Sequence, residues 1–298
     1  MNGIVVINKP KGCTSHDIVY KLKKMFNEKV GHTGTLDPMA EGVLPILVGK
    51  GTLLSKYLIN HDKKYIVKLQ LGIKTDTADS EGKIIEEKQV QQNLLNKENI
   101  KKVLESFIGK QEQIPPIYSA IKVNGKKLYE YARKGQSVEI KPRMIEIYDI
   151  KFISFLPEEN QIEFEVFCGK GTYIRSLCED IAAKFETVGY MKALKRIQVG
   201  NFSIEDSVTI EELEKNINNN NYIKSKIISI ENLFNNSDNI TLNNKKLQLF
   251  LNGVKLTQNY DNGIYKIYNE NKEFIGIGII EDKLLKRDII IWNNTSYT

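Results

Sequence analysis

The stretch Gly31-His32-Thr33-Gly34-Thr35-Leu36-Asp37-Pro38 combines two glycines, a histidine, an aspartate and a proline within eight residues. Its two glycines have no Cβ atom and therefore let the backbone approach a ligand closely. Pro38 biases Asp37 toward extended backbone, which can hold the carboxylate in a fixed direction. Taken alone, an Asp-Pro pair is more typical of a turn, and a lone histidine of a structural or surface position. The role of this stretch must therefore be inferred from the segments around it.

Glycine and proline remain frequent beyond this stretch. Residues 31–51 contain five glycines and two prolines, which predicts a tightly turned loop interrupted by the apolar run 43–48. Apolar or alternating runs predict strands at residues 3–7, 64–71, 145–155 and 161–167. Helical spacing predicts helices after a Ser15 cap, at residues 98–107 and from Gly171 onward. This mixture predicts an α+β fold with a large sheet.

The composition changes after Asp206, where asparagine becomes frequent. The run 218–221 indicates a solvated loop, and residues 235–238 form a second polar break. Beyond that break, apolar runs punctuated by glycine predict short strands at residues 264–268, 274–280 and 289–292. We therefore expect a larger domain at residues 1–235 and a small β-domain at residues 240–298.

The bulk properties restrict the class of protein. The chain has 298 residues, of which 41% are hydrophobic, so it can bury one sizeable core and support a second small domain. Its formal net charge of +6 permits an anionic partner without requiring one. Its three cysteines form no C-x-x-C pair, which argues against a zinc knuckle. No run approaches the roughly 20 apolar residues that span a membrane. We expect a monomeric, cytoplasmic protein without membrane association.

One basic segment holds most of the charge excess. Residues 119–143 contain seven basic and two acidic residues, a net charge of +5, and tyrosines are interleaved with them. The basic side chains that we consider candidates for RNA phosphate contacts are Lys122, Lys126, Lys127, Arg133 and Arg143. Cations for phosphate and aromatic rings for unstacked bases are what an RNA-loop binder needs. The alternative is an ordinary solvated face.

Two Gly-Lys-Gly-Thr segments, at residues 49–52 and 169–172, superficially resemble phosphate loops. A P-loop needs glycine five residues before the lysine and Ser or Thr directly after it. Pro45 and Glu165 occupy those glycine positions, and glycine follows each lysine, so an NTP-dependent enzyme is excluded. The acidic residues of 76–81 fail the spacing of a calcium loop. We expect no metal ion and no cofactor.

Several short motifs occur in order between Gly3 and about Phe202. They are Asn8-Lys9-Pro10, residues 31–45, Lys64-Tyr65, Leu71-Gly72, residues 113–122, Gly125-Lys126-Lys127-Leu128-Tyr129, residues 171–175 and Leu194-Lys195-Arg196. Each motif is weak alone, but the ordered set resembles the TruB family of pseudouridine synthases, which modify uridine 55 in the tRNA T-loop. Residues 252–253 and 274–278 show a looser resemblance to PUA modules. Thr35 departs from the family pattern, because many members have alanine there.

The resemblance implies a pseudouridine synthase fold: a mixed, mostly antiparallel sheet with flanking helices, a central cleft and a PUA-like C-terminal β-domain. It also implies that Asp37 is the catalytic nucleophile and that Tyr65 stacks on the target uracil. Arg175 matches the arginine paired with the aspartate, and His32 matches the histidine associated with nucleotide flipping. The remaining substrate-binding positions that it implies are Lys9, Tyr173 and Leu194. The implied partner is the T-arm stem-loop of tRNA.

The implied reaction suits these residue types. Forming pseudouridine breaks the N1–C1′ bond and rejoins the base through C5, without a redox step. The nucleophile must be ionised, and burial would raise the pKa of an aspartate unless a guanidinium such as Arg175 opposed this. Stacking on Tyr65 can offset part of the cost of flipping the base. Tyr65 is also the candidate base for the C5 proton, and Asp37 could attack either C6 or C1′.

Two other functions remain open at this point. A tRNA-binding chaperone could act through the same cleft, and a pseudouridine synthase could act on another RNA. The basic segment at residues 119–143 favours stand-alone recognition of the T-loop over a guide-dependent subunit. Asp37, Tyr65 and Arg175 together favour an enzyme over a protein that only binds RNA.

Overall fold

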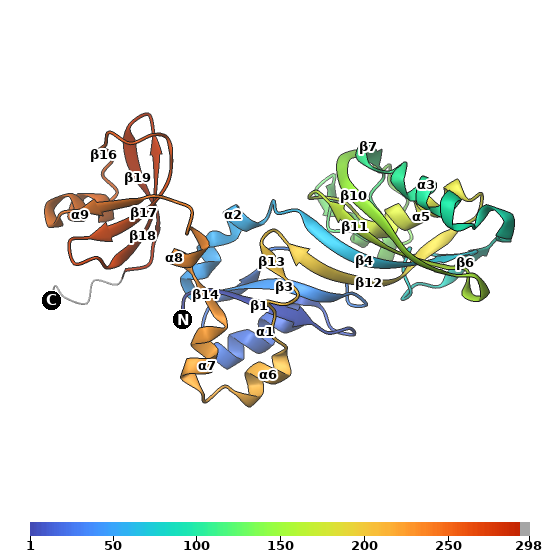
Figure 1. Cartoon of the computed structure of the whole chain (residues 1–298), viewed down its shortest axis with the longest axis horizontal. Coiled ribbons are helices and arrows are strands. Elements are labelled where there is room, and N and C mark those ends of the chain that lie inside the picture. Colours follow the sequence, from blue (N-terminus) through green and yellow to red (C-terminus); the bar gives the residue numbers. More distant parts are fainter. Residues whose placement is uncertain (293–298) are drawn as a thin grey trace.

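The computed structural model describes residues 1–292, and its larger domain is built on a ten-stranded sheet (Figure 1). The strand order is β14-β1-β3-β12-β4-β11-β10-β7, with β13 paired to β12 and β2 paired to β3. The strands are β1 (Gly3–Lys9), β2 (Val30–His32), β3 (Glu41–Val48), β4 (Lys63–Leu71), β7 (Gly109–Gln113), β10 (Arg143–Leu156), β11 (Gln161–Cys168), β12 (Gly189–Val199), β13 (Phe202–Ser203) and β14 (Ile227–Ser229). The expected α+β fold with a large mixed sheet is confirmed.

The centre of the sheet contains a short parallel contact. Among residues 1–292, the named strands of this sheet pair antiparallel except β3 and β12, which run parallel for two residue pairs. At Gly42, which has a φ of +105°, an added Cβ would lie 2.2 Å from the Arg196 carbonyl oxygen. Glycine is therefore required where these two strands meet. This junction lies directly after the loop that carries Asp37.

Side chains of β1 alternate between two cores. Val5 and Ile7 pack with the helices on one face, whereas Ile4 and Val6 pack into a second cluster on the other.

The helices of the larger domain are α1 (Ser15–Phe26), α2 (Ser55–Leu58), α3 (Lys97–Glu105), α4 (Leu128–Arg133), α5 (Ile174–Lys184), α6 (Ile210–Lys215), α7 (Asn220–Ser225) and α8 (Ile230–Leu233). Two hairpins complete it: β5 (Ile73–Thr75) with β6 (Ile84–Glu87), and β8 (Lys122–Val123) with β9 (Lys126–Lys127).

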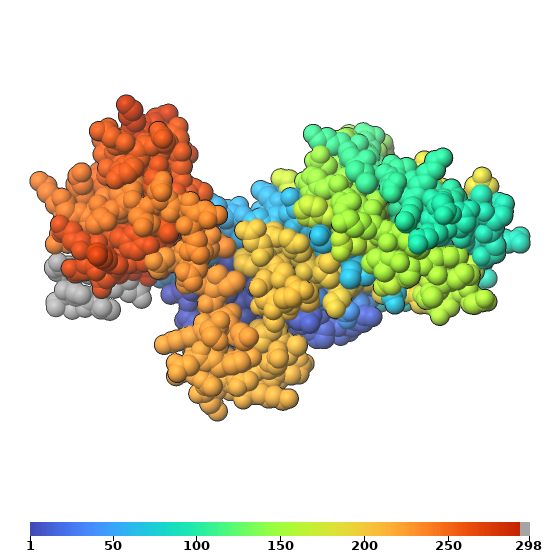
Figure 2. Space-filling model, viewed as in Figure 1, coloured from blue at the N-terminus to red at the C-terminus, as the bar shows by residue number. Residues whose placement is uncertain are grey.

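The C-terminal part of the chain forms its own sheet. Its order is β15-β17-β18-β19-β16, with α9 (Asn244–Leu251) beside it. The strands are β15 (Asn239–Leu242), β16 (Leu256–Thr257), β17 (Gly263–Asn269), β18 (Phe274–Glu281) and β19 (Leu284–Ile290). It forms a lobe at one end of the molecule (Figure 2). Ile277 and Ile289 pack into the second core cluster, and Asp288 accepts hydrogen bonds from Lys56 and Tyr57.

Several expected boundaries were wrong. Thr14, not Ser15, caps α1 through a capping box with Asp17, because the Ser15 hydroxyl is engaged elsewhere in the core. The helix expected from Gly171 begins at Ile174. The last expected strand, 289–292, overlaps β19 only at residues 289–290, because β19 runs from Leu284 to Ile290. The end of the expected C-terminal domain, residues 293–298, lies outside the described residues.

Two kinds of feature are absent from residues 1–292. None of the helices there has the length and apolar character that crossing a lipid bilayer requires. Over the same residues, no group of three or more His, Cys, Asp or Glu side chains is placed to hold a metal ion. Cys13, Cys168 and Cys178 are free thiols.

Candidate active site

Asp37 lies at a cavity of about 370 Å³ in the larger domain. The loop between β2 and β3 carries Asp37, and its side chain retains 34% exposure. Segments far apart in the sequence supply the other walls of the cavity. The residues among the expected site that line it are Asp37, Tyr65, Tyr173, Arg175 and Leu194. The fold therefore brings together five of the seven positions that the resemblance implied.

Arg175, in the first turn of α5, is the partner of the Asp37 carboxylate. Its Nε lies 3.1 Å from Asp37 Oδ2, and its Nη1 lies 3.8 Å from the buried Asp79 Oδ2. The guanidinium also donates to the carbonyl oxygens of Thr77 at 3.2 Å and Tyr118 at 3.0 Å. These four contacts come from three separate segments, so the Arg175 side chain is held in one orientation.

Burial and charge act in opposite directions on Asp37. Burial raises the pKa of the Asp37 carboxyl, Arg175 opposes that rise, and Asp79 adds to it. The net direction is upward, so burial outweighs the ion pair. The expected opposition between burial and Arg175 is present, and removing the guanidinium would raise the pKa of Asp37 further.

Buried polar side chains hold the Asp37 loop from behind. Lys9 is fully buried, and its Nζ donates to the carbonyl oxygens of Pro10, Cys13 and Pro38 at 2.9, 2.8 and 3.3 Å. The resemblance implied substrate binding by Lys9, but its ammonium contacts backbone and it is not among the residues that line the cavity. Its position suits orientation of the loop.

Arg196 is the second support of this loop. It is 1% exposed, and its guanidinium donates to the carbonyl oxygens of Val43 at 2.7 Å, Gly34 at 3.1 Å and Thr35 at 3.4 Å. Ser15 adds a third support, because its hydroxyl bonds both the N–H and the carbonyl of Leu36. The chain on both sides of the loop is therefore anchored to the sheet and to α1.

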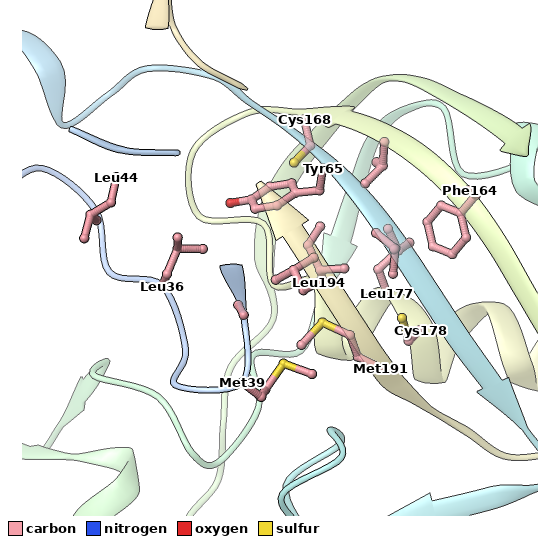
Figure 3. Close-up of a cluster of buried hydrophobic side chains, with 14 of the residues drawn as sticks. Leu36, Met39, Leu44, Tyr65, Phe164, Cys168, Leu177, Cys178, Met191 and Leu194 are labelled. Carbon is pink, nitrogen blue, oxygen red and sulfur yellow. The ribbon is translucent and has the colours of Figure 1, made fainter. Parts of the chain in front are cut away.

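Tyr65 on β4 stands opposite Arg196 on β12 in the strand ladder. Its ring lies between Cys168 and Leu194, with the hydroxyl directed toward the Leu36 side of the cluster (Figure 3). Burial raises the pKa of Tyr65 to about 12, although a hydrogen bond with Arg196 lowers it. The phenol is therefore neutral at neutral pH. This state does not suit the expected role of Tyr65 as a ready base for the C5 proton.

His32, Tyr173 and Leu194 have different surroundings. His32 ends β2 outside the residues that line the cavity, and its Nδ1 has no hydrogen-bond partner within residues 1–292. Tyr173 precedes α5, and its backbone exchanges two hydrogen bonds with the Gln113 side chain at 2.9 and 3.1 Å. Leu194 supplies an apolar wall next to Tyr65.

The basic segment at residues 119–143 forms one side of the cavity. Ser119, Ala120 and Tyr129 of this segment line the cavity, as does the preceding Tyr118. Lys127 and Arg133 lie over the Tyr129 ring, at 5.4 and 5.3 Å from its centre. The other phosphate candidates, Lys122, Lys126 and Arg143, are exposed. The candidate phosphate-binding residues therefore belong to the same segment that supplies part of the cavity lining.

Two charged residues near Asp37, Asp79 and Arg196, were not among the expected site residues. Asp79 is one of the acidic residues of 76–81 that fail the calcium-loop spacing, yet it is 5% exposed and contacts Arg175. Arg196 was noted only within a motif. Both are charged residues in alternating strand or turn sequence, where solvent exposure is the usual expectation. Their burial depends on partners 96 to 162 positions away, which no local pattern reveals.

The structure thus places Asp37, Arg175 and Tyr65 at one cavity beside the mixed sheet. The chain belongs to the TruB family of pseudouridine synthases. The profile of "TruB family pseudouridylate synthase (N terminal domain)" matches residues 23–174. "tRNA pseudouridylate synthase B C-terminal domain" matches residues 175–235, and "Pseudouridine synthase II TruB, C-terminal" matches residues 239–286.

Similar proteins cover nearly the whole chain. A tRNA pseudouridine synthase B of Clostridium kluyveri is 44% identical over 95% of this chain and 96% of its own length. The protein of the same name from Caldanaerobacter subterraneus subsp. tengcongensis is 41% identical, over 96% of this chain and 98% of its own length.

Two solved structures show the same fold. The structure titled H/ACA RNP bound to a substrate RNA containing 2′-deoxyuridine has a TM-score of 0.69 and 20% identity. The match covers 99% of this chain and 87% of the chain in that structure. A Cbf5-Nop10-Gar1 complex gives a TM-score of 0.66 and 24% identity, over 93% of this chain and 78% of that chain. At these identities the likeness concerns the fold alone.

Proposed function

We propose that this chain isomerises uridine 55 in the T-loop of tRNA to pseudouridine, with Asp37 as the nucleophile. The observation that carries the proposal is the 3.1 Å contact between Arg175 and Asp37 in a cavity that Tyr65 also lines. Membership of the TruB family and relatives named tRNA pseudouridine synthase B support the reaction and the class of RNA.

In this proposal, Asp37 attacks C6 of the base or C1′ of the sugar. Arg175 keeps the carboxylate ionised against the effect of burial, and it fixes the direction of the carboxylate. The N1–C1′ bond breaks, the base turns within the cavity, C5 bonds to C1′, and the bond to Asp37 breaks. C5 then loses its proton and N1 gains one, so the product is an isomer of the substrate. We assign stacking on the uracil to Tyr65, because its neutral phenol is a poor proton acceptor.

We further propose that two regions hold the RNA. Residues 119–143 place exposed cations beside the cavity, which suits contact with phosphates of the T-arm stem-loop. The described residues of the expected domain at 240–298 act as a PUA-like RNA-binding domain beside a catalytic domain at residues 1–235. His32 assists flipping of the target nucleotide, and Tyr173 and Leu194 contact it. We propose that the protein acts as a monomer in the cytoplasm, and its three free thiols suit a reducing compartment.

The test uses an unmodified T-arm stem-loop and maps pseudouridine after incubation with wild type and Asp37→Asn. Wild type should convert uridine 55, and a stem-loop with cytidine at that position should yield no product. Asp37→Asn should give undetectable product, because an amide is not a nucleophile at neutral pH. Absence of product with wild type would refute the enzyme. Equal product from Asp37→Asn would refute the nucleophile.

The same variant separates catalysis from chaperone activity. Asp37→Asn should still bind the stem-loop, so a pure RNA chaperone would lose nothing on this substitution.

The pKa of Asp37 is raised in the folded protein, so the folded state binds protons more tightly than the unfolded chain. This carboxyl therefore opposes folding at neutral pH, once the pH exceeds its unfolded value of 3.8. Asp37→Asn should accordingly match or exceed the wild-type melting temperature.

A further inference from the structure

The hydroxyl of Ser119 has no assigned role in the fold. Ser119 is 6% exposed and lines the cavity that contains Asp37 and Arg175. Its Oγ is buried and has no hydrogen-bond partner within residues 1–292. Buried hydroxyl groups in folded proteins are normally hydrogen-bonded, and an unpaired one is unfavourable. An unpaired hydroxyl at the wall of a reaction cavity therefore indicates a partner that arrives with the substrate.

The backbone around Ser119 is firmly held. The preceding carbonyl, of Tyr118, accepts a hydrogen bond from Arg175 Nη2 at 3.0 Å. The Ser119 carbonyl accepts one from the Tyr129 backbone N–H at 3.2 Å. Both contacts use the main chain, so the side-chain hydroxyl is not needed to shape this segment. Its position is nevertheless tied to the same guanidinium that holds Asp37.

Two other buried hydroxyl side chains, those of Ser176 and Thr187, differ from the side chain of Ser119. Ser176 is 5% exposed and donates to the Ile114 carbonyl at 2.8 Å. Thr187 is 5% exposed and donates to the Lys88 carbonyl at 3.2 Å. Neither lines the cavity. The contrast shows that burial alone does not leave a hydroxyl unpaired in this domain.

We propose that the Ser119 hydroxyl donates a hydrogen bond to a carbonyl oxygen of the flipped uracil. This inference rests on the proposed function. Turning uracil about its N3···C6 axis exchanges N1 with C5, as the isomerisation requires, and it also exchanges the C2 and C4 carbonyls. A donor beside one carbonyl before the turn therefore faces a carbonyl again afterwards. A neutral hydroxyl serves both orientations without competing with Arg175 for the Asp37 carboxylate.

The first test compares Ser119→Ala with Thr187→Val, a matched loss of a buried hydroxyl that lies outside the cavity. Ser119→Ala should lower the single-turnover rate or the affinity for the T-arm stem-loop by roughly 3- to 10-fold, as expected for one hydrogen bond. Its melting temperature should equal or exceed that of wild type. Thr187→Val should melt lower and retain the wild-type rate. A wild-type rate and affinity for Ser119→Ala would overturn the proposal.

The second test identifies the group that Ser119 meets. Stem-loops carry 2-thiouridine, 4-thiouridine or 2′-deoxyuridine at the target position, and each is combined with wild type and Ser119→Ala. Sulfur is a weak acceptor, so the effects of Ser119→Ala and of at least one thio substitution should be non-additive. Additive effects for both thio substrates would overturn the proposal, as would coupling only to 2′-deoxyuridine. Wild type inactive on ordinary uridine would instead refute the proposed function.

Discussion

The Asp37 loop and the basic segment at residues 119–143 border one cavity but are built in opposite ways. Buried polar groups of Lys9, Arg196 and Ser15 hold the loop from behind. The basic segment consists of two-residue strands and a six-residue helix, and most of its cations are exposed. A reacting carboxylate must be held in one geometry, whereas phosphate contacts tolerate mobile, hydrated charges.

This difference predicts how each region responds to substitution. Removing a buried donor behind the loop leaves carbonyl oxygens unpaired, so stability and catalysis should fall together. Removing an exposed lysine from the basic segment leaves no buried group unpaired. Its effect should therefore appear in RNA affinity and salt dependence alone.

Among the substitutions around Asp37 and in the basic segment, the largest effect is expected for Arg175→Gln, which removes the charge that faces Asp37. The pKa of Asp37, already raised by burial, should rise further once this opposing charge is gone. Activity should fall by at least about 100-fold at neutral pH, as for loss of a key electrostatic group. Activity requires the ionised carboxylate, so the acidic limb of the pH–rate profile should move to higher pH.

The matched variant for this prediction is Arg175→Lys, which retains the charge but not the planar guanidinium. It should restore part of the pH profile but little of the rate, because an ammonium cannot reproduce the contacts of Arg175 to Asp37, Thr77 and Tyr118. Single-turnover rates between pH 5 and 9 give both quantities. An unshifted acidic limb in Arg175→Gln would mean that Arg175 does not control ionisation of Asp37.

A smaller effect on rate, with a clear loss of stability, is expected for Arg196→Met. The carbonyl oxygens of Gly34, Thr35 and Val43 lose their donor, and the free energy of unfolding should fall by about 3 kcal/mol. Chemical denaturation gives this value. Arg287→Met is the control, because the exposed Arg287 guanidinium also donates to one carbonyl, of Leu251. Equal losses in the two variants would refute the special role of Arg196.

The smallest effect on chemistry is expected when Lys126 and Lys127 are both changed to alanine. If each contacts one phosphate, the slope of log affinity against log salt should flatten by about 1.5. The rate at saturating RNA and the melting temperature should change little, since the Lys127 contact with the Tyr129 ring is the structural contact that is lost. Lys101→Ala with Lys102→Ala, two exposed lysines on α3, should leave the slope unchanged. An identical slope in both double variants would place the basic segment away from phosphate.

Much of the architecture was accessible from local patterns. The strands of the large sheet show apolar runs or alternation, so β1, β4, β10 and β11 were expected close to their observed ends. Three of the five strands of the C-terminal sheet were expected from glycine-punctuated apolar runs, with an error in the bounds of β19, whereas β15 and β16 were not expected. Boundaries failed where a side chain has a tertiary partner, as at Ser15, whose hydroxyl bonds Leu36 and does not cap α1.

Asp37, Tyr65 and Arg175 could be singled out because ordered motifs carry family resemblance even when each motif is short. Their chemistry could also be anticipated, since residue type sets the ordinary pKa and hydrogen-bonding capacity of each side chain. The order of secondary-structure elements and the class of reaction follow from such information, which is stored along the chain itself.

Whether a side chain is buried, and which group it pairs with, depends on distant parts of the chain. Only the folded structure shows these properties. Lys9 and Arg196 are charged residues that sequence patterns place at the surface, yet the loop backbone satisfies them inside the domain. Asp79 contacts Arg175 across 96 positions, and the hydroxyl of Ser119 is left unpaired within reach of the cavity. Such facts arise from long-range packing, because hydrogen bonds and desolvation depend on which groups meet and not on their spacing in sequence.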